Sequence, residues 1–143
     1  KKDVLTDILK LSEEQSLLLD DPNLEPDTFE KNVNRKAALI DKLEQLDTGF
    51  ESLYDKVKEE LESNRDIHKE QIRQMQELIR ALTELNMQIQ ATEARNKEKA
   101  TAKFAYIRQQ AKEIRSSQKI VKEYYNNMMH KAYNEPHFLD NKK

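Results

Sequence analysis

Apolar residues recur every three or four positions in the first twenty residues, which is the spacing that places side chains on one face of an α-helix. They are Val4, Leu5, Ile8, Leu9, Leu11, Leu18 and Leu19. We therefore predict a short first helix from about Lys2 to Leu19. The following segment, DDPNLEPD at residues 20–27, contains two prolines, which disfavour helix in the residues before them.

The second helix is expected to begin at this segment, with Asp27 or Thr28 as its N-cap and Glu30 as the capping-box partner of Asp27. Its apolar positions are Phe29, Val33, Ala37, Ile40, Leu43, Phe50, Tyr54, Val57 and Leu61. A glycine within a helix costs about 1 kcal/mol relative to alanine, so we expect a kink near Gly49. The pattern fades at ESNRD, residues 62–66, where we predict a turn.

The third helix is predicted to begin near residue 66. It either runs unbroken to about residue 132, on the order of 100 Å at 1.5 Å per residue, or is interrupted within residues 90–103. Its first apolar positions are Ile72, Met75, Leu78, Ile79, Leu82, Leu85 and Ile89. Asn86 either sits among them and sets the register of packing or lies at the edge of the apolar face. Residues 90–103 are polar, but they contain strong helix formers and neither proline nor glycine. Pro136 is expected to end the helix.

The most regular pattern in the chain is an apolar stripe that begins at Phe104. From this residue the steps alternate between three and four, as in a coiled coil. We call this set the C-terminal stripe: Phe104, Ile107, Ala111, Ile114, Gln118, Val121, Tyr125 and Met128. A second helix of roughly 37 residues can cover only the first part of so long a third helix. The stripe must then be covered by the first helix, a second copy of the chain or another protein.

The composition supports this all-α prediction. The chain has 143 residues with a single glycine and three prolines, whereas hairpins and phosphate-binding loops require several glycines. Charged residues make up 36% of the chain and apolar residues also 36%, which is typical of a thin core. The expected fold is an elongated antiparallel helical bundle, similar to a coiled coil, with a short first helix and two long ones. We expect a helical domain at residues 1–135 and a tail at residues 136–143.

The sequence has no signal for a catalytic, metal or membrane-spanning site. The chain has no cysteine, so disulfides and thiolate metal sites are excluded, and a cytoplasmic location is expected. No apolar run approaches the roughly 20 residues that cross a bilayer. The three histidines lack partners at metal-ligand spacing, and no nucleophile motif is present, so we expect neither an enzyme nor a cofactor.

Charge is distributed unevenly along the chain. Residues 1–90 contain 13 Lys and Arg against 21 Asp and Glu, whereas residues 91–143 contain 12 against 6. Acidic and basic helices that lie against each other explain this distribution. A nucleic-acid partner is not expected, because the basic residues alternate with acidic ones.

Several stretches resemble the FlgN-type flagellar export chaperones, especially those of Gram-positive bacteria. A K-x-x-L-I-x-x-L-like run corresponds to Lys36, Leu39, Ile40 and Leu43, and an L-x-x-L-x-x-x-N-like run to Leu78 or Leu82 with Leu85 and Asn86. The ending, Tyr133 followed by FLDNKK at residues 138–143, is similar to the family's late tyrosine and "FIDKK"-like end. The glycine that often follows that tyrosine is replaced here by NEP, residues 134–136.

The resemblance implies a cytosolic protein that binds the C-terminal helical segments of hook–filament junction proteins and prevents their premature assembly before export. It also implies docking to the flagellar export gate, for which Tyr133 and Phe138 are candidates. The sequence itself offers a surface for the client. Its candidate residues are Phe104, Ile107, Ala111, Ile114, Val121, Tyr125 and Met128.

Two alternatives remain. The chain could be a structural coiled-coil protein that self-associates through the C-terminal stripe, and a homodimer in the absence of client is compatible with both hypotheses. It could also be an enzyme subunit or nucleic-acid binder that uses the basic C-terminal half. Steeply salt-dependent binding to DNA or RNA would distinguish the last case.

Overall fold

The computed structural model describes the backbone of residues 1–142 and the side chains of residues 1–130. Within that backbone the chain forms three helices and no strand: α1 (Lys2–Asp20), α2 (Pro26–Ser63) and α3 (Lys69–Lys142). The prediction of an all-α fold with a short first helix and two long ones is confirmed. The turn predicted at residues 62–66 lies between Ser63 and Lys69. No helix in the described part is long and apolar enough to cross a membrane.

The ends of two helices differ from the predictions. The N-cap of α2 is Glu25, and Pro26 occupies the first helical turn without any side-chain cap, so the predicted cap at Asp27 or Thr28 is wrong. Proline suits this position because its φ is already helical and its missing N–H would have no partner there. The predicted end before Pro136 is also wrong, since α3 continues to Lys142. A proline removes one helical hydrogen bond, and a long helix can continue past it.

Gly49 does not interrupt α2, which is one helix from Pro26 to Ser63. Its backbone has no positive φ, and a Cβ built on it would meet nothing within 4 Å. The helix is therefore unbroken at Gly49, and a kink there stays a prediction. Neither backbone conformation nor packing requires a glycine at this position.

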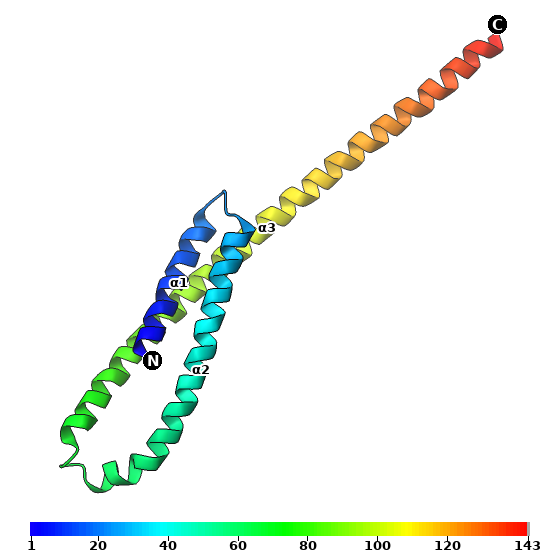
Figure 1. Ribbon diagram of the computed structural model, residues 1–143. Helices are drawn as coiled ribbons and strands as arrows, with labels where there is room; N and C mark the ends of the chain where they lie inside the picture. Colours follow the sequence, from blue (N-terminus) through cyan, green and yellow to red (C-terminus); the bar gives the residue numbers. More distant parts are fainter. Residues whose placement is uncertain (143) are drawn as a thin grey trace. The chain divides into compact units, whose positions relative to one another are not determined.

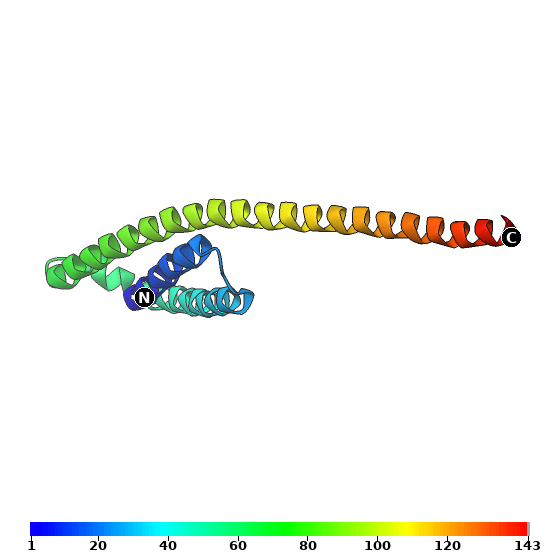
Figure 2. The same ribbon diagram turned by 90° about the horizontal axis from the view of Figure 1, so that it is seen from above.

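The chain divides into two compact units, Lys1–Thr101 and Ala102–Lys143. In the first unit, α1 lies alongside α2 and residues 82–99 of α3, with α2 antiparallel to both (Figures 1 and 2). The second unit is the C-terminal part of α3. The expected division into a domain at residues 1–135 and a tail at 136–143 stays a prediction.

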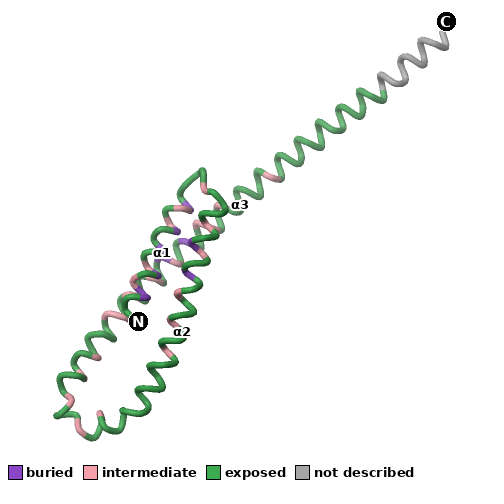
Figure 3. The backbone as a smooth tube through the Cα atoms, viewed as in Figure 1, coloured by how far each residue is buried: buried purple, intermediate pink, exposed green. Residues whose placement is uncertain are grey.

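The core of the first unit is small and lies along α1 (Figure 3). The buried apolar side chains are Val4, Leu5, Ile8, Leu11 and Leu19. Val4, Leu5 and Ile8 form one cluster, against which Leu39 and Leu43 of α2 and Leu82, Leu85 and Ile89 of α3 pack. Each fully buried side chain of this kind stabilises the fold by about 1.5–3 kcal/mol. The short helix thus supplies most of the core that joins the two long helices.

Candidate partner-binding surface

The C-terminal stripe lies on the surface of the second unit. Its large apolar side chains are 44% to 60% exposed, from Phe104 at the lower end to Tyr125 at the upper end, and only Ala111 is half-buried. The contacts that α1 makes on α3 lie instead between Leu82 and Lys99. Within the first unit, α1 is thus packed against residues 82–99, and which of the three expected covers occupies the stripe stays a prediction.

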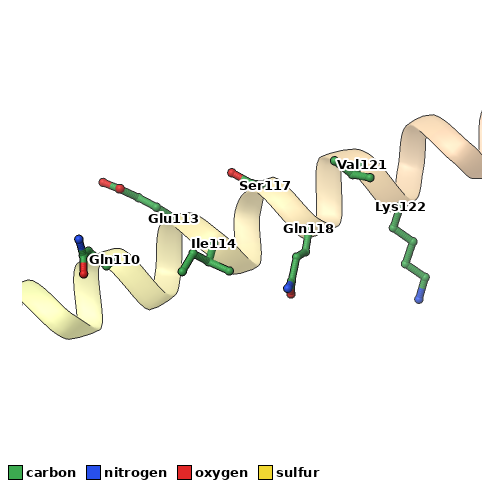
Figure 4. A pocket seen from close by; sticks show the side chains of 7 residues that line it. All are labelled: Gln110, Glu113, Ile114, Ser117, Gln118, Val121 and Lys122. Carbon is green, nitrogen blue, oxygen red and sulfur yellow. The ribbon is translucent and has the colours of Figure 1, made fainter. Parts of the chain in front are cut away.

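A shallow depression lies in the middle of the stripe (Figure 4). It is lined by Gln110, Glu113, Ile114, Ser117, Gln118, Val121 and Lys122. All seven residues belong to one helix, so the depression has no opposing wall. Small-molecule sites are concave and enclose most of their ligand, whereas an open helix face suits another helix. This geometry fits a partner protein better than a small ligand.

Apolar side chains also occur outside the stripe. Tyr106, Ile120, Tyr124 and Met129 are between 61% and 71% exposed. The rings of Tyr124 and Tyr125 meet edge to face with their centroids 6.0 Å apart, and the Tyr106 hydroxyl accepts a hydrogen bond from Gln110 Nε2 at 2.8 Å. The heptad pattern did not identify these four residues, because it follows one row of positions. The grouping of tyrosine and methionine at residues 124–129 is the sequence signal for Tyr124 and Met129.

A second apolar surface, which sequence reasoning missed, lies between α2 and α3 beyond the N-terminus of α1. Two adjoining grooves are lined there by Leu46, Phe50, Tyr54 and Leu61 of α2 and by Ile72, Met75, Leu78, Ile79 and Leu82 of α3. Phe50 and Tyr54 stack with their centroids 6.2 Å apart. Apart from Leu46, these residues belong to the apolar positions predicted for the two long helices. They are partly exposed because α1 is too short to fill this end of the first unit.

A buried polar cluster holds the C-terminal half of α1. It consists of Ser12, Gln15, Asn32, Lys36, Glu93 and Asn96. Glu93 Oε1 accepts hydrogen bonds from Ser12 Oγ at 2.6 Å and from Lys36 Nζ at 2.5 Å. Gln15 Oε1 accepts from Lys36 Nζ at 2.8 Å and from Asn96 Nδ2 at 3.2 Å. These bonds connect all three helices, and their geometry matches only one register of α1.

The surroundings of Glu93 shift the pKa of its carboxyl group. Burial is the largest single influence on the pKa of Glu93 and raises it, but the hydrogen bonds from Lys36 and Ser12 and the charge of Lys36 together bring it below its ordinary value. The carboxylate is therefore favoured in the folded state. Because its side chain is 40% exposed, solvent screens the ion pair and its contribution is smaller than that of a fully buried pair.

The buried asparagines are Asn32 and Asn96, each 2% exposed. Asn32 Nδ2 donates to the Leu11 carbonyl at 3.0 Å and Asn96 Nδ2 to the Ser12 carbonyl at 2.7 Å, while both Oδ1 atoms are buried without a partner. Asn86 is exposed, so it lies at the edge of the apolar face, which was one of its two interpretations. The register-setting role proposed for Asn86 suits Asn32 and Asn96 better.

Tyr133 and Phe138, the candidates for export-gate docking, lie outside the residues whose side chains are described. Among the described residues, no three His, Cys, Asp or Glu side chains are grouped as a metal site. No protein-family model, curated protein or solved structure matches this chain. The structure thus defines an all-α protein with a helical unit at residues 1–101 and an exposed apolar helix face at residues 104–128.

Proposed function

We propose that this protein is a helix-binding chaperone whose C-terminal stripe holds an amphipathic helix of its client. The single observation that carries the proposal is the exposure of six large apolar side chains at heptad spacing between Phe104 and Met128. Contiguous apolar surface of this kind marks an interaction site, and its spacing suits a partner helix. Methionine and tyrosine at one end of the stripe favour adaptable contacts.

The identity of the client comes from the sequence resemblance to the flagellar export chaperones. On that basis the protein binds the C-terminal helical segments of hook–filament junction proteins in the cytosol, prevents their premature assembly and delivers them to the export gate. Of the residues that carry the resemblance, Leu39 and Leu43 pack against the core around Leu5, and Lys36 lies in the polar cluster. These residues therefore support the fold that precedes the stripe.

The proposal is tested by calorimetric titration of the C-terminal segment of a hook–filament junction protein into the full chain. Ile114→Asp or Val121→Asp should weaken binding by about tenfold or more, because each places a charge in an apolar contact. Ile120→Asp is the matched control, since Ile120 is a similarly exposed apolar residue outside the stripe. Circular dichroism should show the same helix content in all variants. Equal affinity for Ile114→Asp and wild type would remove the stripe from the binding site.

Self-association through the same stripe, as in a structural coiled-coil protein, is the second candidate function. Heptad spacing also suits the pairing of two copies of a helix. Light scattering during the titration distinguishes the two. Binding of one segment per chain, with loss of any dimer, supports the chaperone. A dimer that persists unchanged in the presence of the segment supports a structural coiled-coil protein.

A further inference from the structure

Three basic residues accompany the C-terminal stripe at seven-residue spacing: Arg108, Arg115 and Lys122. Each directly follows an apolar residue of the stripe, which is a flanking position that faces the partner in a coiled coil. We call this row the basic flank. In the corresponding row on the other side of the stripe, residues 103, 110, 117 and 124, only Lys103 is charged. Three of the four charges beside the stripe therefore lie along one side of the contact surface.

The basic flank has no carboxylate of its own to pair with. No Asp or Glu lies three or four residues before or after any of its members, and these are the positions at which helical side chains meet. Among the described side chains none is within ion-pair distance of the three, and all three are exposed. Arg73 in the first unit shows the contrast, because it binds Glu70 and Glu77 at 2.6 Å each.

We infer that the helix bound by the C-terminal stripe carries Asp or Glu at seven-residue spacing along the edge that faces the basic flank. This inference rests on the proposed function, since it specifies the chemistry of the helix that occupies the same surface. Opposite charges at flanking positions select the partner and its orientation, and like charges oppose pairing. The exposed position of the row means that its main effects are on specificity and salt dependence.

The same row disfavours a second copy of the chain as the occupant. In an antiparallel pair of stripes, flanks of the same kind face each other, so Arg115 lies near Arg115 of the other copy and Arg108 near Lys122. In a parallel pair the basic flank faces the other side of the stripe, which contains no carboxylate among residues 103, 110, 117 and 124. Neither orientation provides an ion pair, and the antiparallel one brings like charges together.

The test uses three synthetic helical peptides of about four heptads with identical apolar positions. Their flanking positions carry Glu, Gln or Lys. Binding to the full chain is measured by fluorescence anisotropy, at concentrations where light scattering shows monomeric peptides. Three exposed ion pairs should make the Glu peptide bind about tenfold more tightly than the Gln peptide at low salt. The Lys peptide should bind most weakly, and the differences should shrink at about 0.5 M salt.

Two double variants separate the row from overall charge. Arg115→Gln/Lys122→Gln should lose most of the preference for Glu. Lys112→Gln/Lys119→Gln removes the same charge from a row further round the helix and should retain the preference. If both double variants lose the preference for the Glu peptide equally, only net charge matters and the inference is overturned. Equal binding of all three peptides would also overturn it, while leaving the stripe as a binding surface.

The remaining outcomes separate this inference from the proposed function. If no peptide binds but the hook–filament junction segment does, and Ile114→Asp weakens it, the inference is wrong and the proposed function survives. If neither the peptides nor the segment bind, both are wrong.

Discussion

The ion pair between Lys36 and Glu93 leads to an asymmetric prediction, because its two side chains differ in exposure. The Lys36 side chain is 11% exposed and the Glu93 side chain is 40% exposed. Glu93→Gln leaves a buried ammonium without a counter-charge, whereas Lys36→Met leaves a carboxylate that water can reach. We therefore expect Glu93→Gln to be the more destabilising substitution.

The magnitude follows from the surroundings of the pair. Removing one partner of a fully buried ion pair costs about 3–5 kcal/mol, but here Glu93 is partly hydrated and Gln15 Oε1 still accepts a hydrogen bond from Lys36 Nζ at 2.8 Å. We expect Glu93→Gln to lower the free energy of unfolding by about 2 kcal/mol. For Lys36→Met we expect about 1 kcal/mol or less, because methionine retains most of the apolar stem and Ser12 still donates to Glu93 at 2.6 Å.

The assay is urea unfolding followed by circular dichroism, with the free-energy difference taken from midpoints at a common denaturant slope. The double variant yields the interaction energy of the pair.

The contribution of Glu93 to stability depends on pH. Because the folded-state pKa of Glu93 is lowered, this contribution is complete above the ordinary value of 4.5 and is lost as the pH falls through the folded-state value. The difference between wild type and Glu93→Gln should therefore shrink below pH 4.5. Equal or greater destabilisation by Lys36→Met at neutral pH would refute this account of the pair.

Three other predictions concern stability. Leu5→Ala should lower the free energy of unfolding by about 3 kcal/mol, since Leu5 is 1% exposed in the core, whereas Leu53→Ala at an exposed position should change it by less than about 0.5 kcal/mol in the same urea assay. Gly49→Ala should stabilise the protein by up to about 1 kcal/mol, because the added methyl group meets no atom; a lower thermal midpoint would show that α2 needs the glycine. Deletion of residues 136–143 should leave the melting temperature of the first unit nearly unchanged, because the buried core lies within residues 4–96, and a large drop in calorimetry would place the tail in the fold.

Local periodicity explains why the helices and the C-terminal stripe could be predicted. The apolar residues of α1 repeat at helical spacing, and no proline or glycine interrupts α3 between Lys69 and Tyr133. Both the helical spacing and the absence of helix breakers involve residues that are close in sequence. The helix ends were less certain, because Pro26 could be taken either as a residue that stops α1 or as one that starts α2, and the structure shows the second role.

The polar cluster could not be predicted from the same pattern. Asn96 donates a hydrogen bond to the carbonyl of Ser12, although the two residues are 84 positions apart in sequence. Nothing in the sequence near either residue indicates that they meet. A serine, lysine or asparagine on a helix is usually solvated, and it becomes part of a core only when a neighbouring helix offers a partner for its hydrogen bonds. The position of α1 against residues 82–99 of α3 provides those partners.

The three helices and the heptad stripe from Phe104 to Met128 could thus be predicted from the chain alone, because both follow from the spacing of its residues. The packed structure was needed to show which surface α1 covers, which polar residues are buried with it, and that the stripe is exposed. These properties depend on contacts between residues far apart in sequence, whose free energies arise only when the helices are packed together.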